Sequence, residues 1–372
     1  MTLNDTTLNI GYRQVGPGRP VYVIAELSAN HHHDLGRAVE IVRAAAAAGA
    51  DAVKVQTYTA DTMTIDSDRP PFRIEGTLWD GRTLYDLYRE AHLPWEWHAP
   101  LQRAAVEAGL DFFSSPFDAS AVAFLDDLGV PAYKIASFEN VDLPLIRRVA
   151  RTGRPVILST GMATLDEVAE AVETFRQAGG SELALLKGAS AYPAPLDQMN
   201  LRAIRTLADT FGVAVGLSDH TLGTEAPAAA VALGASVIEK HLTLSRDEPG
   251  PDSAFSLEPG EFRAMVDAVR ATEAMLGSPE VRRTAKEEGS LAFRRSLFVV
   301  EDVAAGELFT TSNVRAIRPG DGLHTRHIDE VLGRAAAVDI ERGTPLAWSF
   351  VEGGEPVPDT RAPERAASPA TA

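Results

Sequence analysis

The chain has no cysteine among its 372 residues, which excludes disulfides, thiolate metal sites and a cysteine nucleophile. It also lacks an apolar stretch of the roughly 18 residues that a membrane span needs. Residues 1–15 are polar and hold no apolar signal core. We therefore expect a cytoplasmic protein that has no membrane partner.

Positive charge is scarce as well, because 35 lysine and arginine residues face 52 aspartate and glutamate residues, for a net charge of −17. Such a chain offers no basic face to displace counterions from nucleic-acid phosphates, which argues against a nucleic-acid partner. A small anionic substrate remains compatible with this charge if cations cluster locally.

Lysine is rare within that small set of cations. The five lysines are Lys54, Lys134, Lys187, Lys240 and Lys286. All except Lys286 lie in apolar, strand-like segments, where an ammonium group is costly unless an anion meets it. A structural ion pair explains any single one of them, but the four together favour an anion-binding site.

Eight apolar, β-branched runs recur along the chain, each followed by a helix-like pattern, as is typical of parallel strands covered by helices. They are residues 21–26, 52–57, 111–115, 132–137, 155–160, 183–187, 214–220 and 236–241. Eight such units in about 250 residues predict an α/β fold, a (β/α)₈ TIM barrel. A doubly wound sheet is the alternative, but no Gly-x-Gly-x-x-Gly follows the first run.

The predicted barrel takes up residues 1–277 and would form the catalytic domain. We expect a linker at 278–295, a small unit of short strands at 296–351, and a disordered tail rich in proline and alanine at 352–372. A core of about 55 residues is marginal alone, so we expect the small unit to dock on something.

In such barrels the active site lies at the C-terminal ends of the strands. Polar residues gather at those ends: Glu26, Lys54, Gln56, Ser114, Ser115, Lys134, Ser137, Ser159, Thr160, Ser190, Tyr192, His220, Glu239 and His241. Strand alternation places Lys54 with Gln56 on one face, whereas Lys240 has the opposite parity and is expected to pair under a helix. Mixed hydroxyls and lysines predict a site for phosphate and carboxylate.

His220 and His241 end neighbouring strands, close enough to share an ion. Two neutral imidazoles with open positions suit Mn²⁺, Zn²⁺ or Fe²⁺, with water or a substrate oxygen completing the sphere. Hydrogen-bonded structural histidines are the alternative. The run at residues 31–33 also invites a metal interpretation, although clustered histidines in loops are commonly solvated.

Seven segments, in order along the chain, resemble the sialic acid synthase family: residues 25–31, 54–57, 133–137, 158–162, 216–220, 238–241 and 250–252. Residues 294–350 resemble that family's C-terminal antifreeze-like (SAF) domain, with 317–320 as its signature. The resemblance implies a TIM barrel followed by a SAF domain. It also implies a transferase that joins phosphoenolpyruvate to an acetamido sugar.

Four segments look most like the pseudaminic acid synthase branch of the family: residues 56–63, 94–98, 136–141 and 190–195. That likeness implies 2,4-diacetamido-2,4,6-trideoxy-altropyranose as the sugar. N-acetylneuraminate and legionaminate synthases are the near alternatives. Ser190 stands where N-acetylneuraminate members commonly carry asparagine, which disfavours N-acetylmannosamine.

The resemblance also implies a role for each site residue. The residues implied to bind phosphoenolpyruvate are Lys54, Ser115, Lys134, Ser137, Ser159 and Ser190. The sugar would be bound by Gln56, Tyr192, Asp252 and Arg318. A divalent metal on His220 and His241, with Mn²⁺ expected ahead of Mg²⁺ or another ion, would polarise the aldehyde.

Three residues are implied to be catalytic: Glu26, Lys54 and Lys134. Glu26 would orient the metal-bound water or C2 of phosphoenolpyruvate. C3 of phosphoenolpyruvate attacks the aldehyde, water adds to C2, and phosphate leaves by C–O cleavage. Arg318 would reach the sugar from the other subunit of a domain-swapped homodimer.

Three other classes of protein compete with this interpretation. An amidohydrolase-type metal hydrolase is suggested by His31-x-His33 after the first strand, but its further histidines after strands five and six are missing. A synthase that uses a phosphorylated sugar would not need the SAF-like domain. A non-catalytic sugar-binding protein would not need the charged and polar residues at the strand ends.

Overall fold

The computed structural model describes residues 6–248 and 250–354 of the chain. The chain divides into two compact units, Met1–Gly277 and Ser278–Ala372. Most of the predicted disordered tail, residues 355–372, lies outside the described residues. No helix in the described part is long and apolar enough to cross a membrane.

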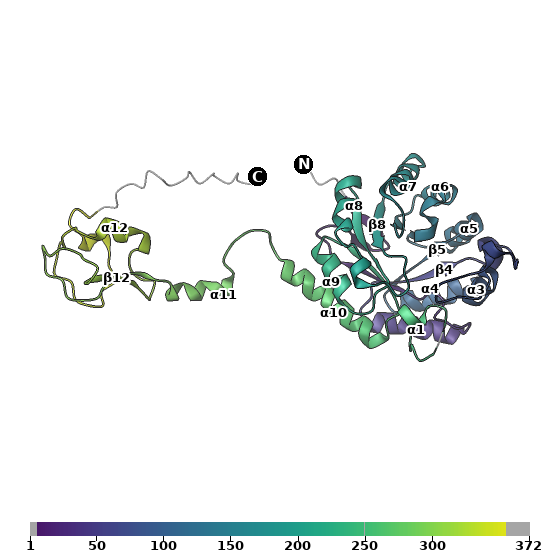
Figure 1. The fold of residues 1–372 in the computed structure, drawn as a ribbon, viewed down its shortest axis with the longest axis horizontal. Coiled ribbons are helices and arrows are strands. Elements are labelled where there is room, and N and C mark those ends of the chain that lie inside the picture. Colours follow the sequence, from purple (N-terminus) through teal and green to yellow (C-terminus); the bar gives the residue numbers. More distant parts are fainter. Residues whose placement is uncertain (1–5, 249, 355–372) are drawn as a thin grey trace. The chain divides into compact units, whose positions relative to one another are not determined.

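The first unit is a closed barrel of eight parallel strands in the order β10-β3-β4-β5-β6-β7-β8-β9, which confirms the predicted TIM barrel (Figure 1). The strands are β3 (Tyr22–Glu26), β4 (Ala52–Thr57), β5 (Asp111–Pro116), β6 (Tyr133–Ile135), β7 (Val156–Ser159), β8 (Leu183–Gly188), β9 (Ala214–Asp219) and β10 (Val237–His241). Each of the eight apolar runs coincides with one of them, although β5 and β8 each extend one residue beyond their run. The barrel closes between the first and last, where Glu26 pairs with His241.

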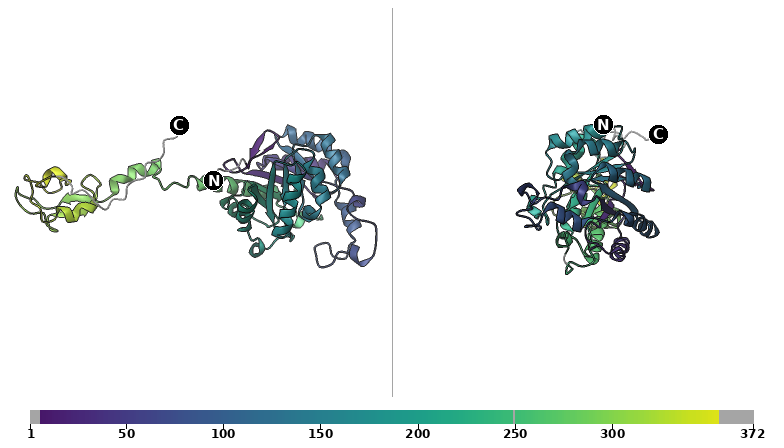
Figure 2. Two further views of the ribbon diagram at one scale, coloured as in Figure 1. Left: turned by 90° about the horizontal axis from the view of Figure 1, so that it is seen from above. Right: turned by 90° about the vertical axis from the view of Figure 1, so that its right-hand side faces the viewer.

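Helices surround the strands on the outside of the barrel, as two views of it show (Figures 1 and 2). They are α1 (Leu35–Ala47), α4 (His98–Glu107), α5 (Ala119–Leu128), α6 (Leu143–Ala150), α7 (Leu165–Gln177), α8 (Ala203–Phe211), α9 (Glu225–Ala232) and α10 (Pro259–Leu276). Their apolar faces bury the outer faces of the strands. Helix α7 begins with a capping box between Thr164 and Glu167.

A short hairpin closes the N-terminal end of the barrel. It consists of β1 (Leu8–Ile10) and β2 (Arg13–Val15). Arg13 Nη1 lies 3.0 Å from Asp111 Oδ2, at the start of β5, and the tyrosine hydroxyl of Tyr22 donates to the same oxygen at 2.8 Å. The opposite end, where the strands terminate, therefore remains as the mouth of the barrel.

A long insertion lies between β4 and α4. It contains α2 (Ala60–Met63), α3 (Leu84–Ala91) and, between them, a hairpin of residues 73–83. Arg73 and Thr83 form an antiparallel bridge, the Ile74 amide donates to Arg82 O at 2.9 Å, and the Gly81 amide donates to Ile74 O at 3.0 Å. We call residues 73–83 the mouth hairpin.

The second unit is small and built from loops around two antiparallel strands, β11 (Ser296–Val299) and β12 (Val314–Ile317). Its core consists of buried apolar side chains, among them Leu297, Val299, Val303, Phe309, Val314 and Leu346. Short helices α11 (Ala285–Glu288) and α12 (Ile328–Val331) complete it. Residues 278–290, including Lys286 on α11, are exposed.

Candidate active site

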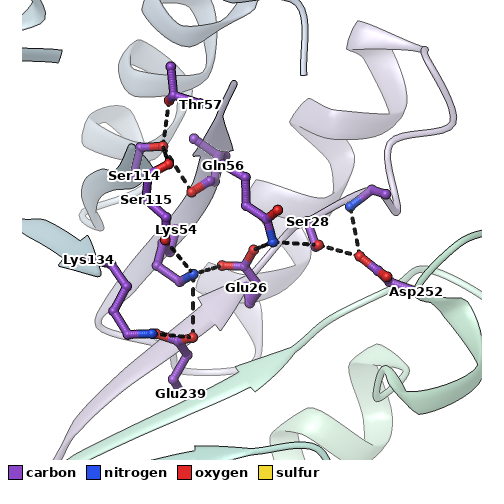
Figure 3. Close-up of polar contacts among 12 residues, drawn as sticks. Glu26, Ser28, Lys54, Gln56, Thr57, Ser114, Ser115, Lys134, Glu239 and Asp252 are labelled. Carbon is purple, nitrogen blue, oxygen red and sulfur yellow. Dashed lines mark hydrogen bonds and ion pairs between the residues drawn. The ribbon is translucent and has the colours of Figure 1, made fainter. Parts of the chain in front are cut away.

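Four charged side chains from β3, β4, β6 and β10 meet inside the barrel mouth (Figure 3). They are Glu26, Lys54, Lys134 and Glu239, and each is at most 4% exposed. Lys54 Nζ lies 2.7 Å from Glu26 Oε2 and 3.4 Å from Glu239 Oε1. Lys134 Nζ lies 3.4 Å from the same Glu239 oxygen. Two ammonium groups and two carboxylates thus balance each other, and we call them the charge quartet.

The four side chains of the charge quartet differ in the direction of their pKa shifts. Burial lowers the pKa of Lys134 to about 8, although Glu239 opposes the shift. Burial also acts on Lys54, but Glu239 and Glu26 outweigh it and raise the pKa of Lys54. Burial raises the pKa of Glu26, whereas for Glu239 the two lysines overcome burial and lower its pKa. Lys54 and Glu239 are therefore the firmly charged pair, and Lys134 and Glu26 are the pair whose charge is easier to lose.

A chain of hydrogen bonds leads from the quartet to the loop after β10 (Figure 3). Gln56 Nε2 donates to Glu26 Oε1 at 3.0 Å and to Ser28 Oγ at 2.9 Å. The Ser28 hydroxyl donates in turn to Asp252, which also accepts from the Ala29 amide at 3.3 Å. Burial raises the pKa of Asp252 against these donors. Three predicted residues, Glu26, Gln56 and Asp252, are thus connected.

Hydroxyl groups line the other side of the site. Ser115 Oγ accepts from Lys54 Nζ at 3.2 Å. A Cβ placed on Gly161 would lie 2.6 Å from Ser137 Oγ and 2.7 Å from Ser190 Oγ, so these two hydroxyls converge over a glycine that leaves room for them. Ser159 Oγ is buried and has no hydrogen-bond partner in the part of the chain that the structure describes. A buried donor of this kind requires an acceptor, and an anionic ligand supplies one.

His220 and His241 lie side by side, with ring centroids 5.4 Å apart. Nδ1 of His220 is 3.0 Å from Ala189 O, and because a carbonyl only accepts, Nδ1 carries the proton and Nε2 keeps its lone pair. Nδ1 of His241 is buried without a partner among the described residues. Burial lowers the pKa of both imidazoles, which keeps them neutral.

This pair fits a metal ion that takes its remaining ligands from water or substrate. Among residues 6–248 and 250–354, no three histidine, cysteine or acidic side chains are grouped as a complete metal site. Two neutral imidazoles with unused nitrogens provide a partial set, as sites that bind substrate at the metal require. Tyr192 packs on one member of this pair, with its ring 4.5 Å from that of His220.

Several residues that the sequence pattern singled out lie away from the charge quartet and the histidine pair. Arg318 is in the second unit, exposed, and its guanidinium has no hydrogen-bond or ion-pair partner within the described ranges. Lys240 is fully buried and lies 2.5 Å from Asp219, so the anion-site interpretation is wrong for it and the expected structural pairing is correct. Lys187 is half-buried and donates to the Gly188 carbonyl.

The expectation of a solvated histidine run is wrong for His31. It is fully buried, its ring lies 5.7 Å from that of Trp97, and its Nδ1 accepts from the His33 amide. His33 faces the Glu90 carbonyl instead. Two other ring nitrogens of the run, His31 Nε2 and His32 Nε2, are buried without a hydrogen-bond partner among the described residues.

Two residues of the site were given no role in advance. Glu239 bridges both lysines. The sequence pattern that could have identified it is strand alternation, which places Glu239 on the same face as His241, two residues later. Ser28 connects Gln56 to Asp252 from a left-handed turn, at a φ of 46°, and no periodicity marks it.

Comparison with known proteins adds an independent line of observation. Residues 41–281 match the NeuB family and residues 294–352 match the SAF domain. A pseudaminic acid synthase of Helicobacter pylori is 45% identical over 90% of this chain and 98% of that protein. An N,N'-diacetyllegionaminic acid synthase of Legionella pneumophila is 36% identical over 92% of this chain and 98% of that protein.

A solved structure agrees with both. The N-acetylneuraminic acid synthetase of Leptospira borgpetersenii, crystallised with citrate, superposes with a TM-score of 0.69 at 31% identity, covering 77% of this chain and 95% of that one. Family match, sequence identity and barrel topology point the same way. The chain belongs to the NeuB family of sialic acid synthases and carries that family's SAF domain after the barrel.

Proposed function

We propose that this chain is a pseudaminic acid synthase, which condenses phosphoenolpyruvate with 2,4-diacetamido-2,4,6-trideoxy-altropyranose to give pseudaminic acid and phosphate. The observation that carries the proposal is that one barrel mouth holds two buried lysines, free hydroxyls and a pair of neutral histidines. The choice of sugar rests on identity, 45% to the pseudaminic acid synthase against 36% to the legionaminic acid synthase. Legionaminate and N-acetylneuraminate synthesis are the alternatives.

Phosphoenolpyruvate brings a phosphate and a carboxylate, which need cations and hydrogen-bond donors. Lys54 and Lys134 supply the positive charge, and in the absence of substrate they rest on Glu26 and Glu239. The hydroxyls supply neutral donors: Ser115, Ser137, Ser159 and Ser190. A charge-assisted hydrogen bond is about twice as strong as a neutral one, so the lysines dominate affinity and the hydroxyls fix orientation.

His220 and His241 would hold a divalent metal, for which Mn²⁺ is our first choice. When bound, such an ion polarises the aldehyde of the open-chain sugar, which is worth several kcal/mol of transition-state stabilisation. The two imidazoles are suited to this role because burial keeps them neutral.

The remaining steps fall to the charge quartet. The C3 carbon of phosphoenolpyruvate forms a bond to the aldehyde carbon as the C2–C3 and C=O π bonds break. This leaves cationic character at C2 and a negative charge on the former aldehyde oxygen, which takes up a proton to become a hydroxyl. Glu26, held by Gln56 and Lys54, orients the water that adds to C2 and accepts its proton, a role that the raised pKa of Glu26 favours. The C2–O bond to phosphate then breaks and its electron pair leaves with the phosphate, while the C2 hydroxyl loses its proton to form the ketone. Lys54 and Lys134 offset the charge of the departing phosphate.

The sugar is proposed to lie against Gln56, Tyr192 and Asp252. Arg318 would complete this subsite from the SAF domain of a second subunit in a domain-swapped homodimer. Its exposure and its lack of partners among the described residues support a role in contacting something else. We place the enzyme in the cytoplasm.

The test is an end-point assay of the purified protein with phosphoenolpyruvate, Mn²⁺ and a panel of acetamido sugars, with the products identified by mass spectrometry. The expected product is a nine-carbon acid from the 2,4-diacetamido-2,4,6-trideoxy sugar, with one phosphate released per product. Product from another sugar alone would reassign the enzyme within its family. Turnover without phosphoenolpyruvate would point to a hydrolase.

A further inference from the structure

The mouth hairpin presents one aromatic side chain to the active site. Trp79 Nε1 donates to Pro251 O at 2.9 Å, in the loop after β10, and the Trp79 ring lies 6.0 Å from that of Tyr192. Its neighbour Leu78 is 53% exposed. The hairpin is held by its own backbone, and the Gly76 amide donates to Asp80 Oδ1 at 3.0 Å near its tip. Trp79 is therefore fixed at the mouth.

Trp79 is connected to the histidine pair by a series of neighbouring rings. The centroid separations are 6.0 Å from Trp79 to Tyr192, 4.5 Å from Tyr192 to His220, and 5.4 Å from His220 to His241. A sugar whose aldehyde lies at the histidines and whose chain runs past Tyr192 directs its other end towards Trp79. That end is C6, which carries only hydrogens in a 6-deoxy sugar.

We propose that Trp79 is a specificity-determining residue, forming the apolar end wall of the sugar subsite and selecting for a methyl group at C6. This inference rests on the proposed function and adds the part of the sugar that Trp79 recognises. The only polar atom of the indole, Nε1, is already bonded to Pro251 O. A 6-hydroxyl pressed against this ring would lose water and find no partner there, whereas a methyl group gains from the contact.

The experiment compares two sugars that differ only at C6, the 2,4-diacetamido-2,4,6-trideoxy substrate and its 6-hydroxy analogue. The enzymes are wild type, Trp79→Ala, Trp79→Phe and, as the control from the same hairpin, Leu78→Ala. The ratio of the kcat/KM values for the two sugars measures the preference at C6. We expect wild type and Leu78→Ala to favour the 6-deoxy sugar by about 10- to 100-fold.

Trp79→Ala should lose most of that preference through a raised KM for the 6-deoxy sugar, with the KM for phosphoenolpyruvate unchanged. Trp79→Phe keeps a ring but not the N–H group, and should retain most of the preference. An undiminished preference in Trp79→Ala would overturn the inference, and conversion of the 6-deoxy sugar in the same assay would show that the proposed function still holds.

Two further outcomes are decisive. If Trp79→Phe lost as much preference as Trp79→Ala, the bond to Pro251 would be the determinant and the wall would be the wrong explanation. If the wild-type enzyme converted none of the acetamido sugars, the proposed function would fail and the inference with it. Because Trp79→Phe preserves the bulk of the ring, it gives an answer even if Trp79→Ala does not fold.

Discussion

Ser28 donates a hydrogen bond to Asp252 across the barrel mouth, joining residues that are 224 positions apart in the chain. The bond ties the turn after the first barrel strand to the loop after the last. It also completes the path that begins at Glu26 and passes through Gln56. Ser28, for which no role was predicted, therefore positions Asp252, which was predicted to bind the sugar.

Replacing Ser28 by alanine should shift the pH dependence of sugar use. Burial raises the pKa of Asp252 and the Ser28 hydrogen bond lowers it, so Ser28→Ala should raise this pKa further. If ionised Asp252 binds the sugar, the acid limb of kcat/KM for the sugar should move to higher pH. A full pH profile checks this, and a limb that stays in place would show that Asp252 does not act as an anion.

Lys134 should set an alkaline limit on phosphoenolpyruvate binding. Its ammonium group is present below its pKa of about 8 and is lost as the pH rises through that value, whereas the pKa of Lys54 is raised. Affinity for phosphoenolpyruvate, measured by calorimetry, should fall by up to about tenfold per pH unit above that pKa. Lys134→Arg, which stays charged, should abolish the limit. An identical limit in this variant would assign the titration to another group.

Removing either site lysine should weaken phosphoenolpyruvate binding more than sugar binding. Lys54→Met and Lys134→Met should each cost about 2–5 kcal/mol of affinity, because each leaves an anion buried and unpaired. Dissociation constants for both ligands measure the effect. Unaltered phosphoenolpyruvate affinity in both variants would make the lysines structural.

Lys240, by contrast, should contribute to the stability of the fold and not to ligand binding. Lys240→Met leaves the Asp219 carboxylate buried and unpaired, and should cost about 3–5 kcal/mol in the free energy of unfolding. The double variant Lys240→Met with Asp219→Leu removes both charges and should recover most of that loss. Urea unfolding of the four proteins forms a double-mutant cycle. Additive losses would mean that the two side chains are not coupled.

Chelation should abolish turnover, and Mn²⁺ or a similar divalent ion should restore it. His241→Ala should remove both activity and bound metal, measured by elemental analysis, while leaving the fold intact by circular dichroism. His33→Ala, in the exposed part of the histidine run, is the matched control and should keep both. A chelated enzyme with full activity would refute the metal site.

Arg318 is tested by mixing two inactive variants. Arg318→Ala keeps a sound barrel and His241→Ala keeps a sound SAF domain, so a hybrid dimer with exchanged domains holds one intact site. With about half of the co-expressed dimers hybrid, roughly a quarter of wild-type activity should return. If the arginine acts within its own chain, the mixture will be as inactive as its parents.

The barrel could be predicted because the pattern that marks each of its strands lies within a short stretch of the sequence. Each parallel strand is covered by helices on the outside and by its neighbours' side chains on the inside, so each appears as a short apolar run. The same locality places Lys54, Gln56 and His241 at strand ends. The family resemblance supplied their roles, which chain position alone does not contain.

Contacts between segments that lie far apart in the chain could not be predicted from the sequence. Glu239 meets two lysines only because the barrel closes between β10 and β3. The position of Trp79 depends on a hairpin whose residues show no regular alternation and whose bond to Pro251 spans 172 positions. His31 resembled a solvated loop residue because no local pattern reveals that Trp97 covers it.

The rarity of lysine makes the molecule an unusually selective target for chemical labelling. Lys54, Lys134 and Lys240 are buried, and Lys187 is half-buried with its ammonium group on a carbonyl, so amine-reactive reagents will meet Lys286 on α11 first. That lysine lies just beyond the end of the barrel unit. A dye or cross-linker at moderate pH should therefore attach there, the chain's own α-amino group aside, and no lysine has to be removed by mutation beforehand.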